Sequence, residues 1–177
     1  SLPVLTKRAP VLLKGEPDSA SEKTVEKVLT QFFRRQREAV LAKLNAKAAT
    51  GWWDAERWDK ELATDLLKAA VSVTGQVAAD TLDSIGEDPE SYDMGRTEKF
   101  LSAVAKSRAG MINSTTQSQI QDALDNAEDD EYEGEDDSAE HVFDVAEEGR
   151  GKGIAQTLLT TFAGFAVTEA VKQRANG

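Results

Sequence analysis

Proline is distributed very unevenly along this sequence, and its distribution limits where long helices can form. Pro3, Pro10 and Pro17 lie within residues 1–18, and the fourth proline is Pro89. Each proline removes a backbone N–H donor and disfavours helical geometry in the residue before it. We therefore expect residues 1–18 to form an extended arm or linker, and residues 19–174 to fold as a single helical domain.

The arm is rich in apolar side chains. So short a segment offers them few partners of its own, and exposed apolar segments usually mark contacts with other molecules. We predict that the arm docks on a partner, and the candidate contacts are Leu2, Val4, Leu5, Leu12 and Leu13.

Beyond the arm, apolar residues recur with the period of a helix, and no stretch shows the alternation typical of a strand. Ser19 and Glu22 have the spacing of a capping box, which predicts a first helix from about Ser19 to about Thr50. Its apolar stripe consists of Val25, Val28, Leu29, Phe32, Phe33, Val40, Leu41 and Leu44.

A second helix is predicted to begin after Asp54, a favourable N-cap residue, and to end near Ile85. Gly86 stands where a glycine commonly ends a helix, and Pro89 then prevents the helix from continuing. The sequence thus predicts two long helices joined by a short turn.

All three tryptophans of the chain lie at the start of the second helix. Trp53 precedes the N-cap and Trp58 follows it, close to the arrangement of a hydrophobic staple. Large aromatic side chains contribute most to stability when they are buried. We therefore assign Trp52, Trp53 and Trp58 to the core, with an exposed binding platform as the alternative.

The second half of the chain predicts shorter helices separated by breaks. A third helix should begin near Asp93. The segment Asn113–Thr116 should interrupt or re-cap it, because Thr116 and Gln119 have capping-box spacing. A short fourth helix should then end near Leu124.

An acidic segment of low complexity follows at residues 125–140. Like-charge repulsion and the lack of apolar residues predict a mobile loop there. A short helix over 141–148 and a glycine-broken connection over 149–153 should lead into a last helix over 154–174. The predicted fold class is all-α, a bundle of four to six helices.

The residue inventory argues against most kinds of catalytic or metal site. There is no cysteine, so thiolate metal sites and disulfides are excluded. The one histidine, His141, is too little for histidine-based metal sites or a Ser-His-Asp triad, and we expect it to be a packing or surface residue. No apolar run approaches the about 20 residues that span a bilayer. We predict no catalytic residue, no metal, no cofactor and no membrane contact.

Two near-motifs do not change this interpretation. The run Arg150-Gly151-Lys152-Gly153 lacks the spacing of a phosphate-binding loop, and no strand is predicted before it. The acidic segment lacks the register of an EF-hand calcium loop. We therefore expect neither a phosphate site nor a calcium site.

The net charge of −11 is unevenly spread. Residues 7–47 carry a local charge of +5, so the other residues sum to −16. So acidic a chain is a poor general binder of nucleic acid, since phosphate contacts need a positive field. We expect the arginines of the first helix to lie on an ordinary solvated helix face, and Arg34, Arg35 and Arg37 are the candidate DNA contacts if that interpretation fails.

Two parts of the sequence together resemble the phage minor head, or head-morphogenesis, family. The first part is Phe100–Leu124, with Ser107-Arg108-Ala109, Ile112-Asn113-Ser114-Thr115-Thr116 and Gln119-Ile120. In that family a helix ends in an I-N-x-T-T segment, an acidic stretch follows, and a final helix carries an R-A-x-x-I-A-R-T-E motif. Here Arg150, Ile154, Ala155 and Thr157 fall on the final motif, while Gln156 and Leu158 replace its arginine and glutamate.

The flanking segments are similar to the C-terminal extension of portal proteins from phages and prophages of actinobacteria. The similar segments are LPVLT, RQREAVLAKL and GWWDAERWDKEL. In those proteins the portal and the minor-head-like domain share one polypeptide. The resemblance therefore implies that Ser1 begins an excised part of a longer chain.

The resemblance implies a structural domain of the virion. Such a domain would act in capsid assembly, DNA packaging or the head–tail junction, through contacts with the portal body, capsid or scaffold. It would be a homo-oligomer in the context of a portal ring, located in the virion and, during assembly, in the host cytoplasm. The alternatives from other classes are a helical enzyme or toxin domain and a DNA-contacting accessory domain.

Overall fold

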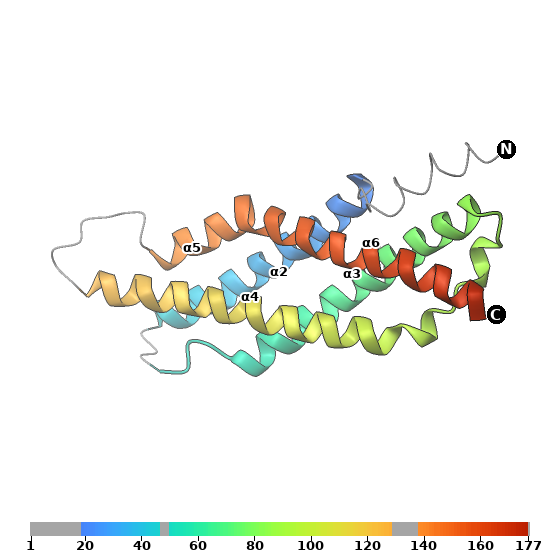
Figure 1. Ribbon diagram of the computed structural model, residues 1–177. Coiled ribbons are helices and arrows are strands. Elements are labelled where there is room, and N and C mark those ends of the chain that lie inside the picture. The colour runs from blue at the N-terminus through green and yellow to red at the C-terminus, as the bar shows by residue number, and fades with distance from the viewer. Residues whose placement is uncertain (1–18, 47–49, 129–137, 177) are drawn as a thin grey trace.

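The computed structural model describes residues 19–46, 50–128 and 138–176, and within these ranges the secondary structure is helical, with no strand (Figure 1). The predicted all-α bundle is confirmed. The elements are α2 (Ser19–Asn45), α3 (Ala55–Ser84), the short 3₁₀ turns η1 (Pro89–Ser91) and η2 (Met94–Arg96), α4 (Glu98–Ala127), α5 (Ala139–Val145), the π-turn η4 (Ala146–Arg150) and α6 (Gly151–Asn176). The N-terminal arm, with all of its candidate partner contacts, lies outside the described residues.

The long helices pack around α3. Close helix pairs are α3–α4, α3–α6, α2–α6 and α2–α3, whereas α4 and α6 are not a close pair. In Figure 1 α4 and α6 run in opposite directions along the bundle, and α5 continues into α6 as one long run. The helices α4 and α6 thus share a neighbour but keep their own backbones apart.

The connection between α2 and α3 and the end of α3 follow the predicted local chemistry. The carboxylate of Asp54 accepts a hydrogen bond from the backbone N–H of Arg57, which caps the first turn of α3. At the other end, Gly86 has a φ of 80°, a left-handed conformation that glycine adopts without strain. Pro89 then opens the 3₁₀ turn η1.

The core consists of aromatic and aliphatic side chains from all the long helices. Trp58 is only 2% exposed and meets the ring of Phe32 edge to face, with 6.1 Å between ring centroids. Trp52 and Trp53 are partly buried and pack against the same core. The assignment to the core is confirmed for Trp58, whereas Trp52 and Trp53 lie at the edge of the core and are partly exposed. Full burial of one large apolar side chain contributes about 1.5–3 kcal/mol.

The predicted break at Asn113–Thr116 is wrong, because α4 runs through this segment without interruption. Asn113 and Thr116 are buried, and their side chains make hydrogen bonds inside the bundle rather than caps. The same side-chain groups that cap a helix end can instead form hydrogen bonds to a neighbouring helix when they face the core. The predicted third and fourth helices are therefore one helix.

The predicted glycine-broken connection at 149–153 is also wrong. The chain stays helical from Ala139 to Asn176, and the irregularity is the π-turn η4 rather than a break. A Cβ on Gly151 would lie 3.0 Å from the carbonyl oxygen of Ala146, so close packing within the helix accounts for this glycine. Glycine lowers the propensity for a helix by only about 1 kcal/mol, which tertiary packing can override.

The helices on both sides extend into residues 125–140, which were predicted to form an acidic loop. Helix α4 includes Asp125, which accepts a hydrogen bond from Gln121 one turn earlier. Ser138 caps α5 by accepting from the backbone N–H of His141. The expectation of a mobile loop now concerns residues 129–137, which lie outside the described residues.

By length and composition alone, one helical run among the described residues could cross a membrane. It is Ala139–Asn176, whose most apolar window has a mean hydropathy of 1.3 and is 44% buried in the bundle. The buried face of α6 packs on α2 and α3. A core helix of a helical bundle has the same character, and the absence of membrane contact stays a prediction.

Candidate functional site

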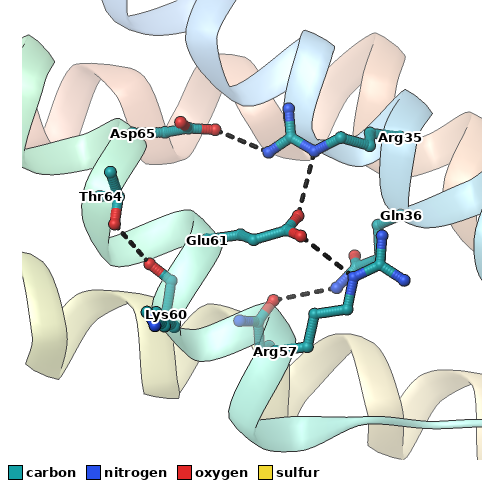
Figure 2. Close-up of polar contacts among 8 residues, drawn as sticks. Arg35, Gln36, Arg57, Lys60, Glu61, Thr64 and Asp65 are labelled. Carbon is teal, nitrogen blue, oxygen red and sulfur yellow. Dashed lines mark hydrogen bonds and ion pairs between the residues drawn. The ribbon is translucent and has the colours of Figure 1, made fainter.

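The three arginines that are candidate DNA contacts all form ion pairs with carboxylates. Figure 2 shows Arg35 reaching from α2 to α3, where its guanidinium donates to Glu61 at 3.1 Å and to Asp65 at 2.8 Å. Arg34 lies 3.5 Å from Glu147 of η4, and Arg37 lies 3.2 Å from Asp144 of α5.

The ion pairs of Arg35 belong to a small network at the α2–α3 contact. Glu61 lies between Arg35 and Arg57, and it accepts a hydrogen bond from Arg57 at 3.0 Å (Figure 2). Burial alone would raise the pKa of Glu61, but the hydrogen bonds from Arg57 and Arg35 outweigh it and lower that pKa. The hydrogen bond to Asp65 raises the pKa of Arg35. The cluster joins α2 to α3, and the carboxylates of Glu61 and Asp65 neutralise its two arginines.

A second polar group lies inside the bundle. The side-chain amide of Gln36 donates to Asn113 at 3.1 Å, and the amide of Asn113 donates to Asp59 at 2.9 Å. The chain of hydrogen bonds joins α2, α4 and α3. Gln36 is fully buried and Asn113 is 1% exposed, so these bonds fix the relative register of three helices at the cost of desolvating two amides.

Arg150 is the last residue of η4, directly before α6, and its side chain reaches across to α4. Its Nη1 donates to the hydroxyl oxygen of Thr116 at 2.7 Å, and its Nη2 donates to the carbonyl oxygen of Ile112 at 2.9 Å. Its guanidinium also lies over the ring of Phe33, 5.9 Å from the centroid. Burial lowers the pKa of Arg150. Both hydrogen-bond acceptors are neutral, and no carboxylate in the described part of the chain pairs with this arginine.

A pocket of about 340 Å³ lies where α4 and α6 stand apart, beside this bridge. Helix α4 contributes one wall and the η4–α6 run the other. Side chains that line it include Arg108, Met111, Thr115, Arg150, Ile154 and Thr157. We call it the α4–α6 pocket.

Two large apolar side chains of α4 are exposed. Met111 is 60% exposed. Further along the same two helices, Phe100 is 46% exposed and stacks on Phe165 at 4.2 Å between ring centroids. This stack and the Arg150 bridge are two places where side chains span the gap between α4 and α6.

The α4–α6 pocket brings together two stretches that are far apart in sequence, 108–116 and 150–157. Arg108 and the Ile112–Thr116 segment come from the first, and Arg150, Ile154 and Thr157 come from the second. Sequence reasoning missed this site because it interpreted both stretches as breaks in helices. The helical spacing of Arg108, Ile112 and Thr116, each four residues apart, was the available signal.

The described residues contain no group of three or more histidine, aspartate or glutamate side chains placed to hold a metal ion. His141 lies partly exposed on α5, and its backbone N–H serves the Ser138 cap. No protein-family model, no curated protein and no solved structure gives a significant match to this chain. The α4–α6 pocket is one of several surface pockets, and two arginines without an ion pair among the described residues line it.

Proposed function

We propose that this chain is a non-catalytic assembly domain of a phage virion, of the portal C-terminal or minor head kind. It acts by protein–protein contacts in capsid assembly, DNA packaging or the head–tail junction. Its partners are other head proteins, and it belongs to a ring-shaped homo-oligomer. It resides in the host cytoplasm during assembly and in the virion afterwards.

One observation carries this proposal. The two stretches that resemble the minor head family lie 38 residues apart between Ile112 and Arg150, yet they meet through hydrogen bonds at one pocket. A shared motif whose parts converge in space is expected when the motif specifies a common structure. Met111 lines the pocket and is exposed, which suits contact with an apolar side chain of another protein.

The DNA-contacting alternative is disfavoured by the geometry of α2. Arg34, Arg35 and Arg37 each face carboxylates within 3.5 Å. A phosphate would have to displace these partners, in a chain whose net charge is −11. Retention on immobilised DNA at about 50 mM salt that falls steeply with added salt would favour this alternative.

The experiment that tests the assembly proposal is mass spectrometry of purified particles. Assembled heads or portal rings from the parent phage are separated from free protein by density, and both fractions are digested and searched for peptides of this chain. We expect the peptides in the particle fraction, at a ratio to the portal body that reflects the ring. Peptides found only in the free fraction would contradict the proposal and favour the enzyme or toxin alternative.

A further inference from the structure

Two arginines line the α4–α6 pocket, and no acidic side chain of the described residues lines it with them. Arg34, Arg35, Arg37, Arg57 and Arg174 are all in ion pairs with carboxylates. Arg108 and Arg150 line the pocket without such a pair in the described ranges, and neither aspartate nor glutamate lines it. Arg96, at an exposed position of η2, also has no ion pair among the described residues, but of these three arginines only Arg108 and Arg150 line one pocket together.

Both arginines have donor capacity left for a ligand. A guanidinium carries five N–H donors. Two donors of Arg150 are used by Thr116 and Ile112, and no hydrogen bond from Arg108 occurs within the described residues. A carboxylate is the group that such a fork binds with two parallel hydrogen bonds, and partial burial strengthens the attraction by excluding water. The charge of the pocket therefore selects an anionic ligand.

The hydroxyl groups of the pocket further restrict the class of ligand that it can bind. Thr115 donates its hydroxyl hydrogen to the carbonyl oxygen of Met111, and Thr157 donates its own to the carbonyl oxygen of Gly153. Each hydroxyl oxygen therefore offers lone pairs to the pocket rather than a hydrogen. Acceptors beside an anion site suit a ligand that carries N–H donors of its own.

The remaining lining is apolar. Met111 and Ile154 flank the arginines, and methionine is a frequent residue at adaptable protein-binding surfaces. A polypeptide supplies all three complements at once: a side-chain carboxylate, backbone N–H donors and an apolar side chain. A fatty acid would satisfy the arginines and the apolar wall, but it brings no donor for Thr115 and Thr157.

We propose that the α4–α6 pocket binds a segment of another virion protein in which a carboxylate side chain lies next to an apolar side chain. The carboxylate is held by Arg108 and Arg150, and the apolar side chain lies against Met111 and Ile154. This inference rests on the proposed assembly function and specifies the partner chemistry of that site.

The test is an NMR titration of the full chain, labelled at methyl groups and at arginine side-chain nitrogens. The probes are the peptide acetyl-Ala-Leu-Glu-Ala-Leu-Glu-amide, the same peptide with glutamine in place of glutamate, and dodecanoate. We expect the glutamate peptide to shift the Met111 methyl and Arg108 Nε signals, and to bind roughly tenfold or more tightly than the glutamine peptide.

The key variant is Arg108→Gln, because Arg108 makes no hydrogen bond within the described residues whose loss would destabilise the fold. It should weaken binding of the glutamate peptide roughly tenfold. Lys152→Gln is the matched control, since it removes the same charge from an exposed site nearby that does not line the pocket. Equal weakening by both variants would mean a general charge effect and would overturn the proposal.

Two further results would also overturn it: binding of dodecanoate without binding of the glutamate peptide, and equal affinity for the two peptides. The particle experiment separates this proposal from the function on which it rests. If the chain is found in particles but the glutamate peptide does not bind, the pocket assignment fails and the assembly function stands. If the chain never occurs in particles, the assembly function fails, and with it the assignment of the partner to the virion.

Discussion

At the scale of single residues, the molecule uses polar side chains where the sequence suggests helix ends. Asn113 and Thr116 have the chemistry of caps, but one links three helices and the other accepts a hydrogen bond from Arg150. A buried polar group without a partner would cost about 1–3 kcal/mol, so these residues are tolerated only because their partners are present. Their role depends on distant parts of the chain.

Trp58 provides a test of the core at this scale. It is 2% exposed, and it contacts the rings of Phe32 and Trp53. Trp58→Ala should therefore lower the free energy of unfolding by about 3–5 kcal/mol, as measured by urea denaturation. Trp52→Ala, at a partly exposed ring, should cost clearly less. Wild-type stability of Trp58→Ala together with lost partner binding would instead identify Trp58 as part of a binding surface.

Glu61 predicts how the stability depends on pH. Hydrogen bonds lower its pKa in the folded chain, so its contribution is present above the ordinary value of 4.5 and is lost as the pH falls through the folded value. Glu61→Gln should lower the free energy of unfolding at pH 7 by about 1 kcal/mol or less, since the network is partly exposed.

The measurement compares wild type and Glu61→Gln by urea denaturation at a series of pH values. Their difference should shrink as the pH falls well below 4.5. Glu38→Gln, at an exposed position of α2 without an ion pair among the described residues, should show little difference at any pH. A Glu61→Gln deficit that persists unchanged in acid would show that lost packing, rather than the carboxylate charge, causes it.

At the scale of elements, the sequence predicts α2 and α3 well because their signals are local. Apolar spacing, the Asp54 cap and Gly86 specify these helices without reference to the rest of the chain. The continuity of α4 could not be predicted in the same way, because it depends on Gln36 and Asp59, which lie far from Asn113 in sequence. The α4–α6 pocket was missed for the same reason, because its two walls come from segments that lie side by side only after the chain has folded.

The glycines of α6 provide a matched pair of tests for this helix. A Cβ at Gly164 would meet nothing within 4 Å, whereas a Cβ at Gly151 would lie 3.0 Å from the carbonyl oxygen of Ala146. Gly164→Ala should therefore raise the free energy of unfolding by roughly 0.5–1 kcal/mol, because alanine is the better helix former. Gly151→Ala should lower it. Thermal denaturation of both variants measures these changes in stability. Stabilisation by Gly151→Ala would contradict the close packing at η4.

At the scale of the whole molecule, acidic charge is concentrated in one part of the chain. Thirteen carboxylates lie between Asp125 and Glu148, and neither lysine nor arginine occurs between Arg108 and Arg150. Helix α4 ends at Ala127 and α5 begins at Ala139, so the intervening residues connect two helices that pack on one another. Repulsion within so acidic a segment opposes the compact state.

Replacing residues 129–137 with a Gly/Ser linker of equal length should therefore leave the melting temperature unchanged or raise it. The physical reason is that like charges are removed while Ser138, which caps α5, is retained. Calorimetry at low and at moderate salt measures the effect, and any gain should shrink with salt. A fall of more than a few degrees, or a calcium-dependent shift of wild type, would contradict the expectation of a mobile loop.

The arrangement of α3 at the centre also determines the order in which contacts can form. Helices α2, α3 and α4 follow one another with short connections, whereas the contact between Glu22 and Gln156 joins positions 134 residues apart. Closing so long a loop costs more entropy than closing a helical hairpin. We therefore expect the α3–α4 hairpin to form in the folding transition state and the seam between α2 and α6 to close after it. Mutations at Leu66 should then slow folding, whereas mutations at Ala155 should mainly speed unfolding.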